Sequence, residues 1–156
     1  MEMTSAEILA AIAASTTLQA LALSRNDGEI ARLLSVNKKK VVPSIITSRG
    51  IASKYPGGAI AAEIVLMKLE GARDAMIASP VAEQKVLGSL LRRQLAFLAS
   101  EGLDFGDATL RGMLDSFATP QGGNILTSQE VATLKSMAVV DDFVSVEAVT
   151  KALNGE

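Results

Sequence analysis

Two long helical patterns, separated by one Ser-Pro step, constrain the fold of this chain most strongly. Apolar residues recur at helical spacing over 59–78, and a second pattern of this kind follows Ser79-Pro80. Serine suits an N-cap, proline suits the first helical position, and Gly102 suits a left-handed helix end. The patterns predict an antiparallel helical hairpin. Gly71 and Gly88 lie inside its helices, which indicates close helix crossing at both positions.

Shorter helices are predicted on both sides of the hairpin. Thr4-Ser5-Ala6-Glu7 and Thr127-Ser128-Gln129-Glu130 are capping boxes, in which a hydroxyl and a carboxylate satisfy each other's backbone donors. No segment is typical of a strand, and 156 residues suit one domain. We therefore expect an all-α, compact multi-helix bundle in a single domain, 1–156. Its parts are a short-helix cluster with a basic turn (1–58), the central antiparallel hairpin (59–100) and an acidic short-helix cluster (101–156).

The composition argues against several classes of function. The chain has no cysteine and no histidine, so it lacks the thiolate and imidazole groups of most zinc sites and the imidazole base of hydrolytic triads. It has one tyrosine and four phenylalanines, which gives few stacking platforms for single-stranded nucleic acid. No apolar run reaches the ~18–20 residues of a membrane span. We expect no enzymatic activity, no cofactor, no metal and no membrane partner.

The charges are segregated along the sequence. Between Ile30 and Ala62 there are six cations and no acid, whereas nine acids and three cations follow from Glu101 onward. Such a division suggests head-to-tail assembly or an anionic partner. The candidate contacts to an anionic partner or an interface are the cations of the basic segment and of the second long helix: Arg32, Lys38, Lys39, Lys40, Arg49, Lys54, Arg92 and Arg93.

The segment 29–51 also resembles a helix-turn-helix. A short helix would be followed by a turn and by a second helix whose amino end carries Lys38, Lys39 and Lys40, where base edges and phosphates are contacted. Pro43 falls within that second helix, and the side chains suited to base readout are lacking. The alternative is a helical corner with a solvated lysine run.

Other polar groups have plain structural interpretations. Asp104 and Asp107 do not supply the five or six oxygens of a calcium loop, so we interpret them as capping residues. Asp141-Asp142 is likewise interpreted as loop and cap. Gly57-Gly58 leads into a helix as anion-binding loops do, but it lacks the Gly-Lys-Ser/Thr ending of a phosphate loop and is interpreted as a turn.

The order of several sequence pieces resembles a family of short helical proteins encoded by tailed bacteriophages near tail and virion genes. The pieces that flank the predicted hairpin are I-A-R-L-L-S-V-N-K-K-K-V-V at 30–42, S-R-G at 48–50, G-L-D-F-G-D-A-T-L-R-G-M-L-D at 102–115, L-T-S-Q-E-V-A-T-L-K-S-M-A at 126–138 and V-S-V-E-A-V at 144–149. The family often has a Gly-Arg-Thr-like run where this chain has Asn37-Lys38-Lys39. The resemblance implies a virion- or tail-associated role and no catalytic residues.

These observations lead to one leading hypothesis and two alternatives. The first is a non-enzymatic structural component of a tailed-phage virion, tail- or neck-associated. It would be present in the virion and, during assembly, in the host cytoplasm, and it would act in a homo-oligomer or with other virion proteins. Its apolar interface would include Leu103, Phe105, Met113, Phe117 and Phe143. The alternatives are a DNA-binding protein using 29–51 and a small adaptor that inhibits a host enzyme.

Overall fold

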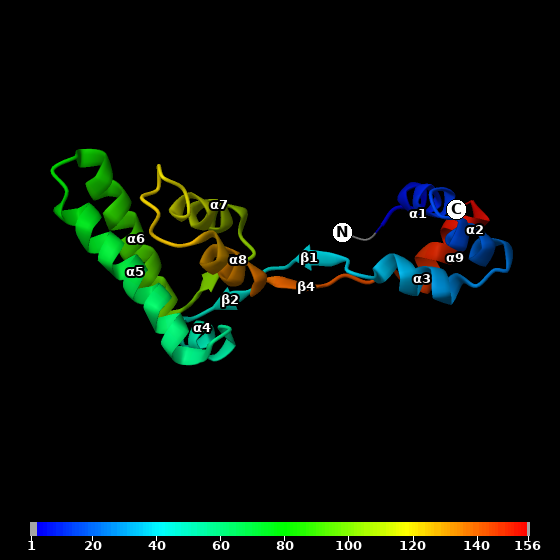
Figure 1. Cartoon of the computed structure of the whole chain (residues 1–156), viewed down its shortest axis with the longest axis horizontal. Coiled ribbons are helices and arrows are strands. Elements are labelled where there is room, and N and C mark those ends of the chain that lie inside the picture. The colour runs from blue at the N-terminus through cyan, green and yellow to red at the C-terminus, as the bar shows by residue number, and fades with distance from the viewer. Residues whose placement is uncertain (1–2, 156) are drawn as a thin grey trace. The chain divides into compact units, whose positions relative to one another are not determined.

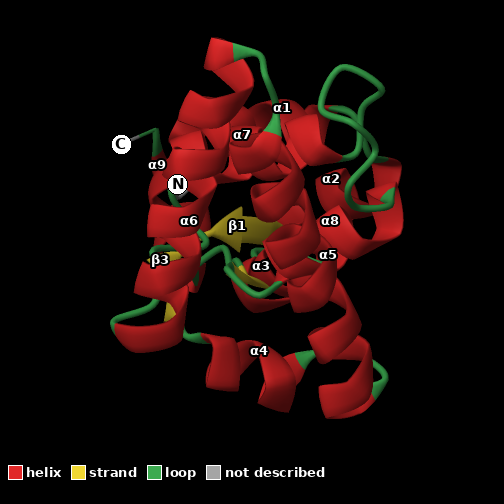
Figure 2. Ribbon diagram, turned by 90° about the vertical axis from the view of Figure 1, so that its left-hand side faces the viewer, coloured by secondary structure: helices red, strands yellow, loops and turns green. Residues whose placement is uncertain are grey.

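The computed structural model describes residues 3–155 of the chain. Helices make up most of these residues, and the strands are only two or three residues long (Figure 2). The prediction of an all-α fold is therefore confirmed.

The contacts within the described chain divide it into two compact units. Unit 1 comprises the described residues of Met1–Lys40 and Val140–Glu156, and unit 2 comprises Val41–Val139. The chain passes between the units twice, through β1 (Lys39–Val41) and β4 (Val139–Asp141), which are hydrogen-bonded neighbours. This organisation differs from the single domain of three consecutive parts that we expected. The reason is that the two ends of the chain share one core, which no local sequence pattern reports.

Unit 1 is a cluster of short helices. They are α1 (Ser5–Ala13), α2 (Thr16–Leu23), α3 (Asp27–Ser35) and α9 (Val146–Asn154) (Figure 1). Ile8 of α1, Ile30 of α3 and Val149 of α9 are completely buried in its core. Thr150 of α9 also donates a hydrogen bond to Asp27 of α3, with an Oγ1–Oδ2 distance of 2.7 Å. Helix α9 is therefore an integral part of the amino-terminal cluster.

Unit 2 contains the remaining helices. Its elements are β2 (Ile45–Ile46), α4 (Ser48–Lys54), α5 (Gly58–Ala78), α6 (Ala82–Ser100), β3 (Leu103–Asp104), α7 (Ala108–Phe117) and α8 (Ser128–Ser136). Strands β2 and β3 pair antiparallel, with Ile45 opposite Asp104 and Ile46 opposite Leu103. One apolar core joins α5 and α6 to α4, α7 and α8, and Ile51, Val65 and Leu134 are almost completely buried in it.

Helices α5 and α6 lie side by side and are connected by the turn at 79–81 (Figure 1). We call this pair the hairpin. A Cβ atom on Gly88 would lie 2.8 Å from the backbone nitrogen of Ile77, so the absence of a side chain allows the close approach of the two helices. The same prediction for Gly71 is wrong, because a Cβ atom there would meet nothing within 4 Å.

Local sequence signals locate the starts of α1, α7 and α8 correctly. Both capping boxes form, at Thr4 and at Thr127, and Asp107 accepts a hydrogen bond from Leu110 N at the start of α7. Gly102 has the left-handed φ of 91° that we expected at the end of the second long helix. Ser79 does not cap α6, which begins only at Ala82; its hydroxyl accepts a hydrogen bond from Val81 N within the turn.

The helix-turn-helix prediction for 29–51 is wrong. Helix α3 ends at Ser35, and the lysines that would begin a recognition helix lie in or beside β1 instead. After Pro43 the chain forms β2 at Ile45–Ile46, and Thr47 then caps α4, so the next helix begins only at Ser48. Pro43 favours an extended residue before it, and the β-branched residues on either side of it suit strands.

Candidate functional site

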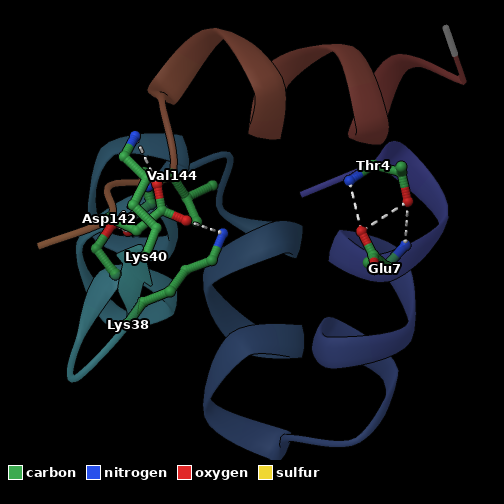
Figure 3. Close-up of polar contacts among 8 residues, drawn as sticks. Thr4, Glu7, Lys38, Lys40, Asp142 and Val144 are labelled. Carbon is green, nitrogen blue, oxygen red and sulfur yellow. Dashed lines mark hydrogen bonds and ion pairs between the residues drawn. The ribbon is translucent and has the colours of Figure 1, made fainter. Parts of the chain in front are cut away.

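Three lysines of the basic segment, Lys38, Lys39 and Lys40, form ion pairs within unit 1. Asp142 lies between two of them: its Oδ2 is 3.2 Å from Nζ of Lys38, and its Oδ1 is 3.1 Å from Nζ of Lys40 (Figure 3). Lys39 pairs with Asp141. Successive side chains of an extended chain point to opposite sides, so Lys38 and Lys40 share one side and Lys39 lies on the other.

Asp142 is the buried centre of this arrangement. Its side chain is only 5 % exposed, and its backbone nitrogen donates a 2.9 Å hydrogen bond to the carbonyl oxygen of Lys38. The hydrogen bond from Lys40 lowers the pKa of Asp142, Lys38 lowers it further, and burial opposes both. Asp142 therefore stays ionised as the counter-ion of two lysines. It lies in a loop, as we interpreted it, but it does not cap a helix, because Ser145 is the N-cap of α9.

The expected separation into a free basic and a free acidic segment is consequently wrong as well. Besides the three lysines, Arg32 forms an ion pair with Glu29 at 2.6 Å. Arg49 and Lys54 on α4 are exposed, and neither forms an ion pair with a described residue. Charges that are distant in the sequence are thus paired inside unit 1, so they cannot serve as opposite poles for docking.

Most acidic side chains described in the carboxyl-terminal third also form ion pairs or hydrogen bonds within the chain. Glu130 pairs with Lys68 of α5 at 2.6 Å, Asp115 with Lys135 at 2.7 Å and Glu147 with Lys151 at 2.8 Å. Burial raises the pKa of Glu130, but the hydrogen bonds from Lys68 and Thr127 outweigh this effect and lower it. Glu156 lies outside the described residues.

Asp104 holds two backbone segments together. Its Oδ1 accepts hydrogen bonds from the backbone nitrogens of Ser44 at 2.7 Å and Gly106 at 2.9 Å. This role is structural, as we interpreted it, although it ties β2 to β3 rather than capping a helix. Within residues 3–155, no three acidic side chains lie close enough together to hold a metal ion.

The apolar interface expected around α7 is only partly exposed. Phe105 and Phe117 are buried in the core of unit 2, where they contribute to the packing of α7 and α8 against the hairpin. Leu103 and Met113 are half-buried against the same core. Phe143, in unit 1, is 71 % exposed. The assignment of Phe105 and Phe117 to an interface is therefore wrong. These large side chains fill space in a core that is otherwise made of smaller aliphatic residues.

A different apolar surface lies on the outer side of α5. Ile60, Ile64 and Met67 are 80 %, 50 % and 61 % exposed and follow one another at helical spacing. The buried residues of this helix, such as Val65 and Leu69, point to the opposite side. Helix α5 thus has one apolar side in the core and a second apolar side that faces away from it. We call this second side the α5 stripe.

Helix α6 has a similar exposed apolar row. Val86, Leu90 and Phe97 are exposed and share one side of the helix, while Leu91 and Leu98 point into the core. We call this row the α6 stripe. Periodicity in the sequence revealed the apolar residues of both helices, but it could not distinguish the side that is buried from the side that is not.

Both helices also carry exposed charges, and those of α6 include the acid Glu83 as well as cations. Glu63 and Glu70 lie beside the α5 stripe, and Lys85, Arg92 and Arg93 lie on the exposed part of α6. None of these five residues forms an ion pair with another described residue, in contrast to Lys38–Lys40. The structure therefore leaves Arg92 and Arg93 available for contacts, as the sequence suggested.

One apolar groove of about 560 Å³ lies between the hairpin and the loop at 119–123. Met76, Leu87, Met113 and Phe117 contribute to its walls, and no acidic or basic side chain lines it. Its size suits a small ligand, and its polar lining consists of hydroxyl and amide residues such as Ser116, Thr119 and Gln121.

No single helix among the described residues is both long and apolar enough to cross a membrane; α1 and α2 together meet the criteria of length and composition but are bent by 113° at the break between them. Comparison of the chain with protein-family models, with curated proteins and with solved structures finds no match.

Proposed function

We propose that this protein is a non-enzymatic structural component of a tailed-phage virion, associated with the tail or neck, and that it acts through protein–protein contacts of the hairpin. The observation that carries the proposal is the α5 stripe. Its three large side chains, Ile60, Ile64 and Met67, are exposed in a continuous row on the longest helix of the described chain. Extended apolar patches on otherwise polar surfaces are typical of interaction sites.

The hairpin surface has the composition of a protein interface. It combines an aromatic residue, Phe97, and two arginines, Arg92 and Arg93, with aliphatic residues and methionine. Aromatic residues, methionine and arginine are enriched at interfaces relative to the rest of protein surfaces. Phe143, in unit 1, is also an exposed aromatic residue and provides a further candidate contact.

The phage setting rests on the resemblance of the sequence pieces at 30–42, 102–115 and 126–138 to short helical proteins encoded near tail genes. In that setting the partners are further copies of this chain or other virion proteins, and the protein is located in the virion and, during assembly, in the host cytoplasm. The DNA-binding alternative loses its basis, because Lys38, Lys39 and Lys40 form no recognition helix and pair with Asp141 and Asp142.

Quantitative mass spectrometry of purified particles from the source of this gene tests the proposal. A structural component is expected in the particles in several copies, at a constant ratio to the major tail protein through successive purification steps. The proposal is contradicted if peptides of this chain are abundant in the producing cells but fall to background in the purified particles.

A further inference from the structure

We infer that a groove between α6 and α7 of unit 2 binds an amphipathic helix of a partner protein, whose apolar side is flanked by lysine or arginine at both ends. The inference rests on the proposed function only where it places this partner among the virion proteins. None of the α5 stripe residues lines the groove, so the two surfaces can be tested separately.

The groove is longer than the hollow beside the loop at 119–123. A second hollow of about 290 Å³ adjoins the first, and both share Leu90 and Met113 as lining residues. The α6 residues that line the two hollows extend from Gln84 to Gln94, which corresponds to a rise of about 15 Å. Nearly three turns of a partner helix span this length, as in complexes that seat an amphipathic helix in an apolar groove.

The walls of the groove are apolar and adaptable. Leu87 and Leu90 of α6 are 48 % and 44 % exposed, and Met76 of α5 and Met113 of α7 are half-buried. Methionine fits apolar surfaces of different shapes because its side chain is unbranched and flexible. Apolar side chains spaced by three or four residues on a partner helix would enter the two hollows on either side of Leu90 and Met113.

The charges of the groove are acidic. Among the described residues, the only charged side chains that line it are Asp104 and Asp107, at the end where α7 begins. Each accepts backbone hydrogen bonds through Oδ1, and neither forms an ion pair with another described residue. At the opposite end, Glu83 lies one turn before Leu87 on the same side of α6 and is also exposed, without an ion pair to a described residue. Acids thus lie at both ends of an apolar groove.

The cations of α6 and α7 lie on other sides of these helices. Lys85 and Arg92 are about half a turn, and Arg93 about a quarter turn, from the side of α6 that lines the groove. Arg111 of α7 points toward α8, where its Nη1 donates a 2.9 Å hydrogen bond to the carbonyl oxygen of Lys135. The groove is therefore complementary to a partner that combines an apolar side with positive ends, and it repels one with negative ends.

Synthetic peptides test this specificity on the full chain. The probe is a helix-forming peptide of about 15 residues with leucines along one side and lysines at both ends. Its control carries glutamates in place of the lysines. At low salt the lysine peptide should bind at least about tenfold more tightly than the glutamate peptide, and added salt should reduce this ratio. Isothermal titration calorimetry measures both affinities.

Methionine methyl resonances locate the bound peptide. In a chain with isotope-labelled methionine methyl groups, the resonances of Met76 and Met113 should shift when the lysine peptide is added, because both residues line the groove. The resonance of Met67, on the α5 stripe, should stay unchanged.

Matched substitutions test the acids at the ends of the groove. Glu83→Gln with Asp107→Asn removes two charges and keeps the N-cap of α7, since asparagine caps a helix as well as aspartate does. This variant should bind the lysine peptide about three- to tenfold more weakly. Glu63→Gln with Glu70→Gln changes the net charge equally on α5 and should leave the affinity unchanged.

A second pair of variants tests the apolar walls. Leu87→Ser with Leu90→Ser should abolish binding of the lysine peptide, whereas Ile60→Ser with Ile64→Ser on the α5 stripe should leave it intact. All four side chains are at least 44 % exposed, so circular dichroism of both variants should match that of the unchanged protein.

The inference is overturned if the two peptides bind equally, if neither binds at millimolar concentration, or if Met67 shifts while Met76 and Met113 do not. Self-association of the chain that Leu87→Ser with Leu90→Ser abolishes would also overturn it, because a second copy would then occupy the groove. A chain that binds no peptide but is present in purified particles overturns only this inference. A chain that binds the lysine peptide but is absent from the particles contradicts only the proposed function.

Discussion

The Oδ1 atom of Asp142 lies 3.1 Å from Nζ of Lys40, although the two residues are separated by most of the chain. Lys38 contacts the other oxygen of the same carboxylate at 3.2 Å (Figure 3). One buried acid thus neutralises the lysine run that looked like a binding patch in the sequence. The same contacts join the start of β1 to the segment that leads into α9, and so connect the two ends of the chain.

Replacing Asp142 by Asn should lower the melting temperature of the protein by several degrees. The substitution keeps the size of the side chain but leaves Lys38 and Lys40 without their counter-ion. Asp141→Asn is the matched control, because the pair that Asp141 forms with Lys39 is more than half exposed and should contribute little. Thermal unfolding followed by circular dichroism measures both. Equal effects of the two substitutions would contradict the role of Asp142.

The contribution of Asp142 should also depend on pH. Because its pKa is lowered in the folded protein, the stabilisation is present above the pKa of an unfolded aspartate, about 3.9, and is lost as the pH falls through the lower folded value. Glu29 and Glu130 also have lowered pKa values, so the test is the difference between the unchanged protein and Asp142→Asn. This difference should shrink below about pH 4 and stay constant near neutrality.

Gly88→Ala should destabilise unit 2 although alanine is the better helix former. The added Cβ atom would lie 2.8 Å from Ile77 N and 2.9 Å from the Cβ atom of Met76. Overpacking of this kind costs about 1–3 kcal/mol, which exceeds the gain of about 1 kcal/mol from helix propensity. Gly112→Ala on α7, where nothing lies within 4 Å, should instead stabilise by up to about 1 kcal/mol. Denaturant unfolding that gives both variants the same sign would contradict the close crossing.

Phe117→Ala and Phe143→Ala should differ sharply in their effects. Phe117 is 7 % exposed in the core of unit 2, so truncation should cost about 3–5 kcal/mol of unfolding free energy. Phe143 is 71 % exposed in unit 1, and its truncation should change the unfolding free energy by less than about 0.5 kcal/mol. Urea titration of the monomeric protein at low concentration measures both values. A small loss for Phe117→Ala would place this residue outside the core.

Local signals explain why much of the fold was predictable from the sequence. The hydroxyl of Thr4 and the carboxylate of Glu7 are three residues apart, so their mutual capping can be read directly from the chain. The same holds for Thr127 with Glu130. Gly88 could be assigned to a close helix approach because glycine is costly in a helix unless the space is needed.

Contacts between distant residues explain the failures. The pairing of Asp142 with Lys38 spans more than a hundred positions, and no spacing rule connects the two residues. The packing of Val149 with the amino-terminal helices is equally non-local, and this packing joins both ends of the chain in unit 1. For the candidate site, Arg92 and Arg93 are exposed, and their role as contacts stays a prediction. Phe105 and Phe117 are buried, as is common for phenylalanine, because α7 and α8 pack them against the hairpin.

The most direct test of the hairpin surface is the mass of the protein after the α5 stripe is made polar. Light scattering across a range of concentrations should show association of the unchanged protein and of Leu23→Lys, a control in unit 1 at a residue that is 89 % exposed. Ile64→Lys with Met67→Lys should remain at 16.2 kDa throughout, because the substitutions place charges where apolar area would be buried. Association of this variant to the same extent as the unchanged protein would contradict the assignment of the α5 stripe as the assembly surface.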